Sequence, residues 1–170
     1  MKKRTIKVVT LLLLVAVLLS VSSPVVHADA AQLRSTQAFM DYLDQEGVKY
    51  TYLGMDDRDE VVAVSYTLEN FSSMTCKLYF RDTEEMVSLR IWDIVTATAG
   101  TNYALSVVNE LNANKKFTKF VLNTSDATVQ AELDMYIDAE TCGRCVYDAM
   151  LTLLILVDNN EVANKLHSLE

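Results

Sequence analysis

The chain has 170 residues, of which 15 are Lys or Arg and 23 are Asp or Glu, so its formal net charge is −8. This acidic balance argues against binding to nucleic acids or to anionic membrane surfaces, because both depend on clustered basic residues. Only four glycines and one proline are present, and no Gly-rich phosphate-binding loop can be found.

The first thirty residues have the pattern of a secretory signal peptide. Four basic residues precede an uncharged apolar run over 8–21, and Ala28 and Ala30 form a small-residue cleavage motif. We expect cleavage after Ala30, which leaves one domain over 31–170 with 11 basic and 22 acidic residues. An uncleaved anchor is the alternative, although a membrane span needs about 20 apolar residues. No cysteine lies near the cut, so we expect a secreted or extracytoplasmic protein without a lipid anchor.

A helix is predicted at the start of the domain, over 35–47. Ser35 or Thr36 can cap its first turn, because their hydroxyls accept hydrogen bonds from free backbone amides. Gly47 ends it, since glycine readily takes the left-handed conformation found after a helix.

The segments that follow alternate between apolar and polar residues, which is typical of strands with one buried face. Strands are predicted over 48–55, 61–68, 74–81 and 86–95. Helical spacing returns over 99–113, with Leu105, Val108 and Leu111 on its buried side. A hairpin is predicted over 116–123 and 128–137, and a last helix over 140–157 that continues after Asp158.

This order of elements predicts an α+β fold. Strands joined by short polar turns pair as an antiparallel meander, and the helices must bury their apolar stripes against one face of the sheet. The expected order is one helix, the meander, a second helix, a hairpin and a final helix, within the single domain over 31–170.

Several of these positions resemble a known family. The opening pattern places Phe39, Leu43, Gly47 and Tyr50 in register, and "VVNELN" is followed by "KFTKFVL" in the middle of the chain. Over about 35–165 the chain resembles the YbjN-like family of small bacterial domains. The resemblance implies a fold like that of type III secretion chaperones, a non-enzymatic role through protein contact, and frequent dimers. This chain differs from many relatives in its export signal, and the C-x-x-C motif described next also departs from the family pattern.

The sequence "TCGRC" places Cys142 and Cys145 at C-x-x-C spacing near the start of the last predicted helix. A helix N-terminus lowers a thiol pKa, which is how redox C-x-x-C motifs are activated. A thioredoxin-like centre also needs a parallel βαβ context and usually a cis-proline, but the only proline is Pro24 in the signal peptide. A local disulfide between the two residues, two free thiols, or pairing of either with Cys76 remain open.

The sequence offers little support for a metal or cofactor site. A zinc site needs about four ligands, and only Cys76 and His167 could complete one. The acidic turns over 56–60 and 82–85 lack calcium-loop spacing, so we expect them to be solvated. Asn112 or Asn114 is expected to end the second helix. We therefore predict no metal and no cofactor.

An aromatic and basic surface is the remaining candidate site. Trp92, Tyr79, Arg90 and Tyr136 all fall on the outward positions of predicted strands, and these residue types are enriched at interface hot spots. Alternatively, a bulge near Asp93 turns Trp92 into the core.

The sequence thus predicts an exported, non-enzymatic protein-binding module, with a homodimer as the favoured assembly. The hypothesis from another class is an extracytoplasmic dithiol–disulfide protein that uses Cys142 and Cys145. A third is a structural module of the cell envelope.

Overall fold

The computed structural model describes residues 31–170 with the exception of residue 114. The predicted signal peptide, with Ala28 and Ala30, lies outside the described residues. The described elements, in chain order, are α2 (Arg34–Glu46), β1 (Thr51–Asp56), β2 (Asp59–Tyr66), β3 (Met74–Arg81), β4 (Met86–Thr96), α3 (Thr101–Ala113), β5 (Lys119–Asn123), β6 (Thr128–Tyr136), α4 (Cys142–Val157) and α5 (Asn160–His167).

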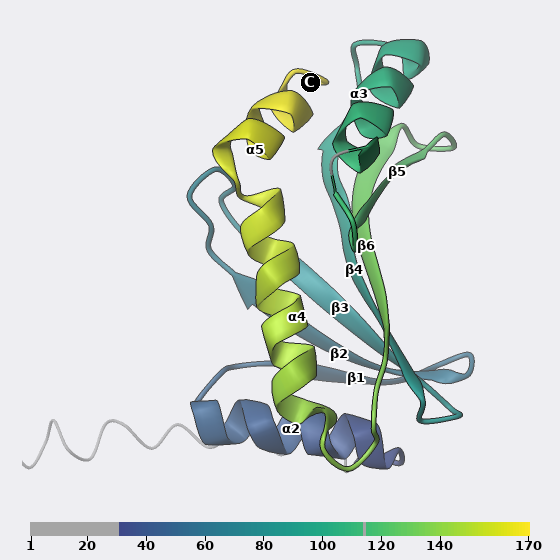
Figure 1. The fold of residues 1–170 in the computed structure, drawn as a ribbon, viewed down its shortest axis with the longest axis vertical. Helices are drawn as coiled ribbons and strands as arrows, with labels where there is room; N and C mark the ends of the chain where they lie inside the picture. Colours follow the sequence, from purple (N-terminus) through teal and green to yellow (C-terminus); the bar gives the residue numbers. More distant parts are fainter. Residues whose placement is uncertain (1–30, 114) are drawn as a thin grey trace, which may run out of the picture.

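The strands form one antiparallel sheet in the order β1-β2-β3-β4-β6-β5. In Figure 1, α4 runs from α2 at one end of the molecule to α5 at the other, and α3 lies above β5. The buried residues of all four helices join one core with the inward residues of the strands. The prediction of an α+β fold with helices on one face of an antiparallel sheet is confirmed.

Strand alternation explains this core. Val62 pairs with Leu78 and Leu78 with Leu89, so apolar side chains from three neighbouring strands project to the same side and are fully buried. Phe39 of α2 then packs on Phe80 of β3, with ring centroids 5.5 Å apart. Each large side chain removed from water in this way contributes about 1.5–3 kcal/mol to folding.

The ends of the helices differ in part from the sequence prediction. Gly47 ends α2 in the left-handed conformation, with φ of 68°, as predicted. Ser35 and Thr36 do not cap it, because the helix already begins at Arg34 and both residues point into the protein, fully buried. The sequence pattern could not show that the capping oxygens come from elsewhere in the chain.

The second helix also packs differently from the prediction. Leu105 is exposed, and the buried stripe is Ala104, Val107, Val108 and Leu111. Asn112 does not end the helix but lies within its last turn, since α3 runs to Ala113. Its amide donates to the Phe120 carbonyl at 2.8 Å and its oxygen accepts from the Phe120 amide at 2.7 Å, so it ties α3 to β5.

The opposite face of the sheet is left without a helix over the described residues. We call it the open face. It consists of the outward residues of β1 to β6 together with the exposed Asp93: Thr51, Gly54, Asp56, Asp59, Val61, Ala63, Ser65, Thr75, Lys77, Tyr79, Arg81, Met86, Ser88, Arg90, Trp92, Asp93, Thr96, Lys119, Val121, Asn123, Thr128, Gln130, Glu132, Asp134 and Tyr136. Within residues 31–170, no described helix is long and apolar enough to span a bilayer.

Candidate functional site

A bulge in β4 shapes a hollow in the surface. Ile91 pairs with Ala131 and Val95 with Val129, so residues 92–94 stand against Gln130 alone. Asp93 takes a φ of 51° to accommodate the extra residues. Pairing of β4 with β3 ends at Cys76 and Ile91, so the two strands part beyond this point.

A cavity of about 780 Å³ lies where the strands part. It is lined by the β2–β3 loop, the bulge, the β5–β6 turn and the C-terminal end of the chain: Asn70, Phe71, Ser72, Ser73, Met74, Thr75, Lys77, Tyr79, Ile91, Trp92, Asp93, Ile94, Asn123, Asp126, His167 and Glu170. Its volume falls within the range of sites that hold small molecules or peptide side chains.

Two of the predicted surface residues meet beside this cavity. The indole N–H of Trp92 donates to the Tyr79 hydroxyl, with 3.3 Å between the heavy atoms. Trp92 retains 42% of its exposure, so the bulge foreseen near Asp93 is present but does not turn the indole into the core. A large aromatic side chain held in place at the surface costs little entropy when it binds a partner.

The other two predicted residues lie apart from this pair. Arg90 is mostly buried and already paired, with its guanidinium 2.7 Å from Asp134 and 3.8 Å from Glu132. Tyr136 pairs with Met86, six residues along β4 from Trp92, which corresponds to about 20 Å. The structure therefore brings Trp92 and Tyr79 together and places Tyr136 at the far end of the open face.

The sequence pattern gave no sign of the contacts that form one rim of the cavity. The His167 ring stacks on Phe71 at 4.8 Å, and its Nε2 lies 3.2 Å from the Asn70 carbonyl. Its Nδ1 lies 2.9 Å from a carboxylate oxygen of Glu170, and this hydrogen bond raises the pKa of His167. Asp158 accepts from the Asn70 amide at 2.8 Å, so the loop is held from two sides.

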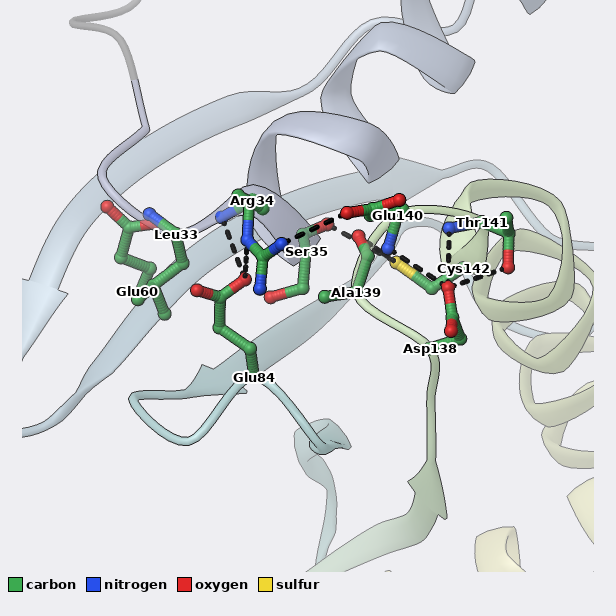
Figure 2. A network of polar contacts seen from close by, with 10 residues as sticks. All are labelled: Leu33, Arg34, Ser35, Glu60, Glu84, Asp138, Ala139, Glu140, Thr141 and Cys142. Carbon is green, nitrogen blue, oxygen red and sulfur yellow. Dashed lines mark hydrogen bonds and ion pairs between the residues drawn. The ribbon is translucent and has the colours of Figure 1, made fainter.

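The C-x-x-C cysteines have different surroundings. Cys142 is buried and its thiol donates to the Ser35 carbonyl at 3.4 Å, whereas Cys145 is exposed and its thiol donates to the Cys142 carbonyl at 3.0 Å (Figure 2 shows Cys142 beside Ser35). All three cysteines are free thiols in the structure. Burial raises the pKa of Cys142 to about 11, which is opposite to the lowering needed for a reactive thiolate.

Gly143 explains why this short sequence packs so closely. It is buried where α4 crosses α2, and an added Cβ would lie 2.7 Å from both the Ala38 carbonyl oxygen and Cβ of Tyr42. Only glycine allows the two helices to approach this far. Cys142 and Gly143 thus form a helix-crossing point, which the C-x-x-C spacing does not reveal.

The acidic turns were predicted to be solvated, and for Glu60 this is wrong. Glu60 is fully buried and accepts from the amides of Gln32 at 2.6 Å and Leu33 at 3.0 Å and from the Tyr52 hydroxyl at 2.6 Å. Its position two residues before Val62 places it on the inward side of β2, a signal that the alternation contains if it is extended back past residue 61.

Glu84 is the second acidic residue near the start of α2, and Figure 2 shows it below Arg34. It accepts from the Arg34 amide at 3.1 Å and pairs with the Arg34 guanidinium at 3.3 Å. The same guanidinium reaches Glu140, at 3.0 Å, in the loop before α4. Glu84 thus accepts from the first amide of α2, and Glu60 accepts from the amides of the two residues just before the helix. Negative charge is favourable at this end of a helix.

Across residues 31–170, omitting 114, no group of three or more His, Cys, Asp or Glu side chains is placed to hold a metal ion. No family model matches the chain, and the search of curated proteins found no match.

Proposed function

We propose that this protein is an exported, non-enzymatic module that binds protein through its open face, and that its first partner is a second copy of itself. The observation that carries the proposal is the charge of that face. It holds four basic and five acidic residues and so has a net charge of only −1, whereas the rest of residues 31–170 carries −10. Two copies that met through their open faces would keep their acidic surfaces apart.

Three of the acidic groups of the open face are already compensated within the sheet. Asp134 and Glu132 pair with Arg90, and Asp59 pairs with Arg81 at 3.4 Å. A partner that covers this face can therefore bury these three carboxylates together with their counter-ions, whereas burial of an isolated carboxylate is costly.

Trp92 is the expected anchor of the interface. It is a large exposed aromatic residue, fixed by Tyr79 and bordered by a cavity that a partner side chain can fill. Residues of this type carry most of the binding energy in protein interfaces. The resemblance to the YbjN-like family points to the same non-enzymatic role.

The dithiol alternative has less support. Cys145 is exposed, but Cys142 is buried and its pKa is raised. Cys142 is therefore not an activated thiolate, and the two thiols are not both accessible to a substrate. A role as a structural module of the envelope is compatible with self-association, and the same experiment bears on it.

The test is the oligomeric state of the exported chain, measured by sedimentation velocity over a range of concentrations. We expect a dimer whose dissociation constant rises at least about 30-fold in Trp92→Ala, because truncation of a hot-spot residue costs about 2 kcal/mol or more.

Tyr103→Ala is the matched control, since Tyr103 has a similar exposure but lies on α3, away from the open face. It should leave the dimer unchanged. A chain that stays monomeric at high concentration, or a dimer that Tyr103→Ala weakens as much as Trp92→Ala does, would contradict the proposal.

A further inference from the structure

We propose that Glu60 is the docking site for the α-ammonium group that signal-peptide cleavage creates at Ala31, so that processing of the exported chain stabilises its fold. The proposal rests on the cleavage predicted after Ala30 and on the described surroundings of Glu60. It is independent of the open face and of any partner.

Glu60 holds the beginning of the domain in place. Its two carboxylate oxygens accept from the amides of Gln32 and Leu33, at 2.6 and 3.0 Å. Ala31, one residue earlier, packs against the core. Because adjacent backbone nitrogens are less than about 3.8 Å apart, the Ala31 nitrogen lies within about 6 Å of the Glu60 carboxylate.

Glu60 is a buried carboxylate whose described partners carry no positive charge. Burial by itself would raise its pKa, but hydrogen bonds from Tyr52, Gln32 and Leu33 outweigh that effect and hold the pKa below its usual value, so the group is ionised. Buried charges in proteins are normally paired with an opposite charge. An ammonium group at Ala31 would provide that charge.

The other charged groups near Glu60 already form ion pairs with other residues. Arg34 is bound to Glu84 and Glu140, and the Arg81 guanidinium is bound to Asp59. Tyr52, the remaining titratable group, keeps its proton and donates a hydrogen bond to the Glu60 carboxylate. The new N-terminus is therefore the cation best placed to neutralise Glu60.

Cleavage changes the charge at this position. Hydrolysis of the Ala30–Ala31 peptide bond consumes one water, leaves a carboxylate on Ala30, and leaves an amine on Ala31 that takes up a proton at neutral pH. A neutral amide in the precursor thus becomes a positive charge next to a buried negative one. Folding is then favoured after export, when the signal peptide has been removed.

The experiment compares two forms of the chain 31–170, which contains every described element and the whole described core. One form has a free amine at Ala31, and the other is acetylated there, which removes the charge and little else. At pH 6.5 the free amine is expected to raise Tm by about 3–6 °C relative to the acetylated form, for one partly buried charge pair in a domain of this size.

The pH dependence identifies the group. The ammonium gains a partner on folding, so its pKa is raised in the folded state above the reference of about 7.7–8.0. The extra stability should be fully present below that reference and should be lost as pH rises through the folded-state pKa. The difference in Tm between the two forms should therefore disappear above about pH 9–10.

Glu60→Gln should remove the difference between the free and acetylated forms, while Glu84→Gln, on the neighbouring turn, should preserve it. If Glu60→Gln does not fold, the test is the α-amine pKa measured on the unsubstituted chain. We expect this pKa to lie about one unit above the reference value. Equal Tm values for the two forms at pH 6.5, an unshifted α-amine pKa, or an exported chain that mass spectrometry shows to begin elsewhere than Ala31 would each overturn the proposal.

Discussion

At the scale of single residues, small side chains decide how α2 and α4 meet. Cys142 and Gly143 are the first two residues of α4, and both are buried against α2. Neither position tolerates a larger group without moving a helix, because close-packed interiors transmit even small changes in volume. The unusual sequence "TCGRC" is therefore explained by packing before any chemistry is invoked.

Gly143→Ala should destabilise the fold by about 1–3 kcal/mol, as expected for overpacking. Alanine favours a helix by up to about 1 kcal/mol over glycine, but here its Cβ would lie 2.7 Å from backbone and side-chain atoms of α2, and the clash is larger. The measurement is the free energy of unfolding in urea. Arg144→Ala, at the exposed neighbouring position, is the control and should change it by less than about 0.5 kcal/mol. A neutral or stabilising Gly143→Ala would show that the helices separate easily.

The native protein should expose one reactive thiol. Cys145 is exposed, whereas burial raises the pKa of Cys142 to about 11 and that of Cys76 to about 12. A thiol reagent at pH 8 should modify Cys145 rapidly and the other two only after unfolding, because the thiolate is the reactive form. Mass spectrometry before and after denaturation counts the modified sites. No reaction in the native state and a single site after unfolding would instead reveal the Cys142–Cys145 disulfide.

At the scale of elements, contacts between distant segments hold the rim of the cavity. The β2–β3 loop is tied to α5 by His167, which has an acceptor near each ring nitrogen: the Asn70 carbonyl and the Glu170 carboxylate. Only the protonated ring can donate to both at once. The link between these elements is therefore expected to depend on pH.

His167→Gln should make this dependence visible. The pKa of His167 is raised in the folded state, so its contribution to stability is present below the unfolded value of about 6.5 and is lost as pH rises through the folded value. Since the side chain is 41% exposed, solvent screening limits the effect to about 0.3–0.5 kcal/mol. Unfolding in urea should show a larger difference between wild type and variant at pH 5.5 than at pH 8.5. A difference that is constant with pH, or larger at pH 8.5, would contradict this role.

Element positions were largely predictable because they depend on local periodicity. The strands over 74–81 and 86–95 and the helix ending at Gly47 follow from alternation, helical spacing and a left-handed stop. The first turn of α2 was not predictable in the same way. Its first amide, on Arg34, donates to Glu84, which is 50 residues away, and the Leu33 amide just before the helix donates to Glu60, which is 27 residues away.

At the scale of the whole molecule, one face of the sheet is covered and the other is not. All four described helices share a single core with the inward residues, while the open face keeps a nearly neutral, partly aromatic surface on an otherwise acidic domain. This asymmetry is the physical basis for the proposed self-association. Trp92 is predicted to contribute more to that contact than Tyr136, because only Trp92 is fixed by a neighbour beside a cavity.

The sequence by itself determined the α+β class, the order of elements and the apolar inward residues of the strands, because each depends on the spacing of apolar residues along a short segment. It left two positions open for Trp92, and the structure showed that the bulge keeps the indole exposed. Only the tertiary structure decided that Glu60 is buried, that Gly143 marks a helix crossing, and that His167 closes the rim of the cavity. These roles depend on contacts between segments that lie far apart in the chain. Local periodicity contains no information about which distant segments will be in contact.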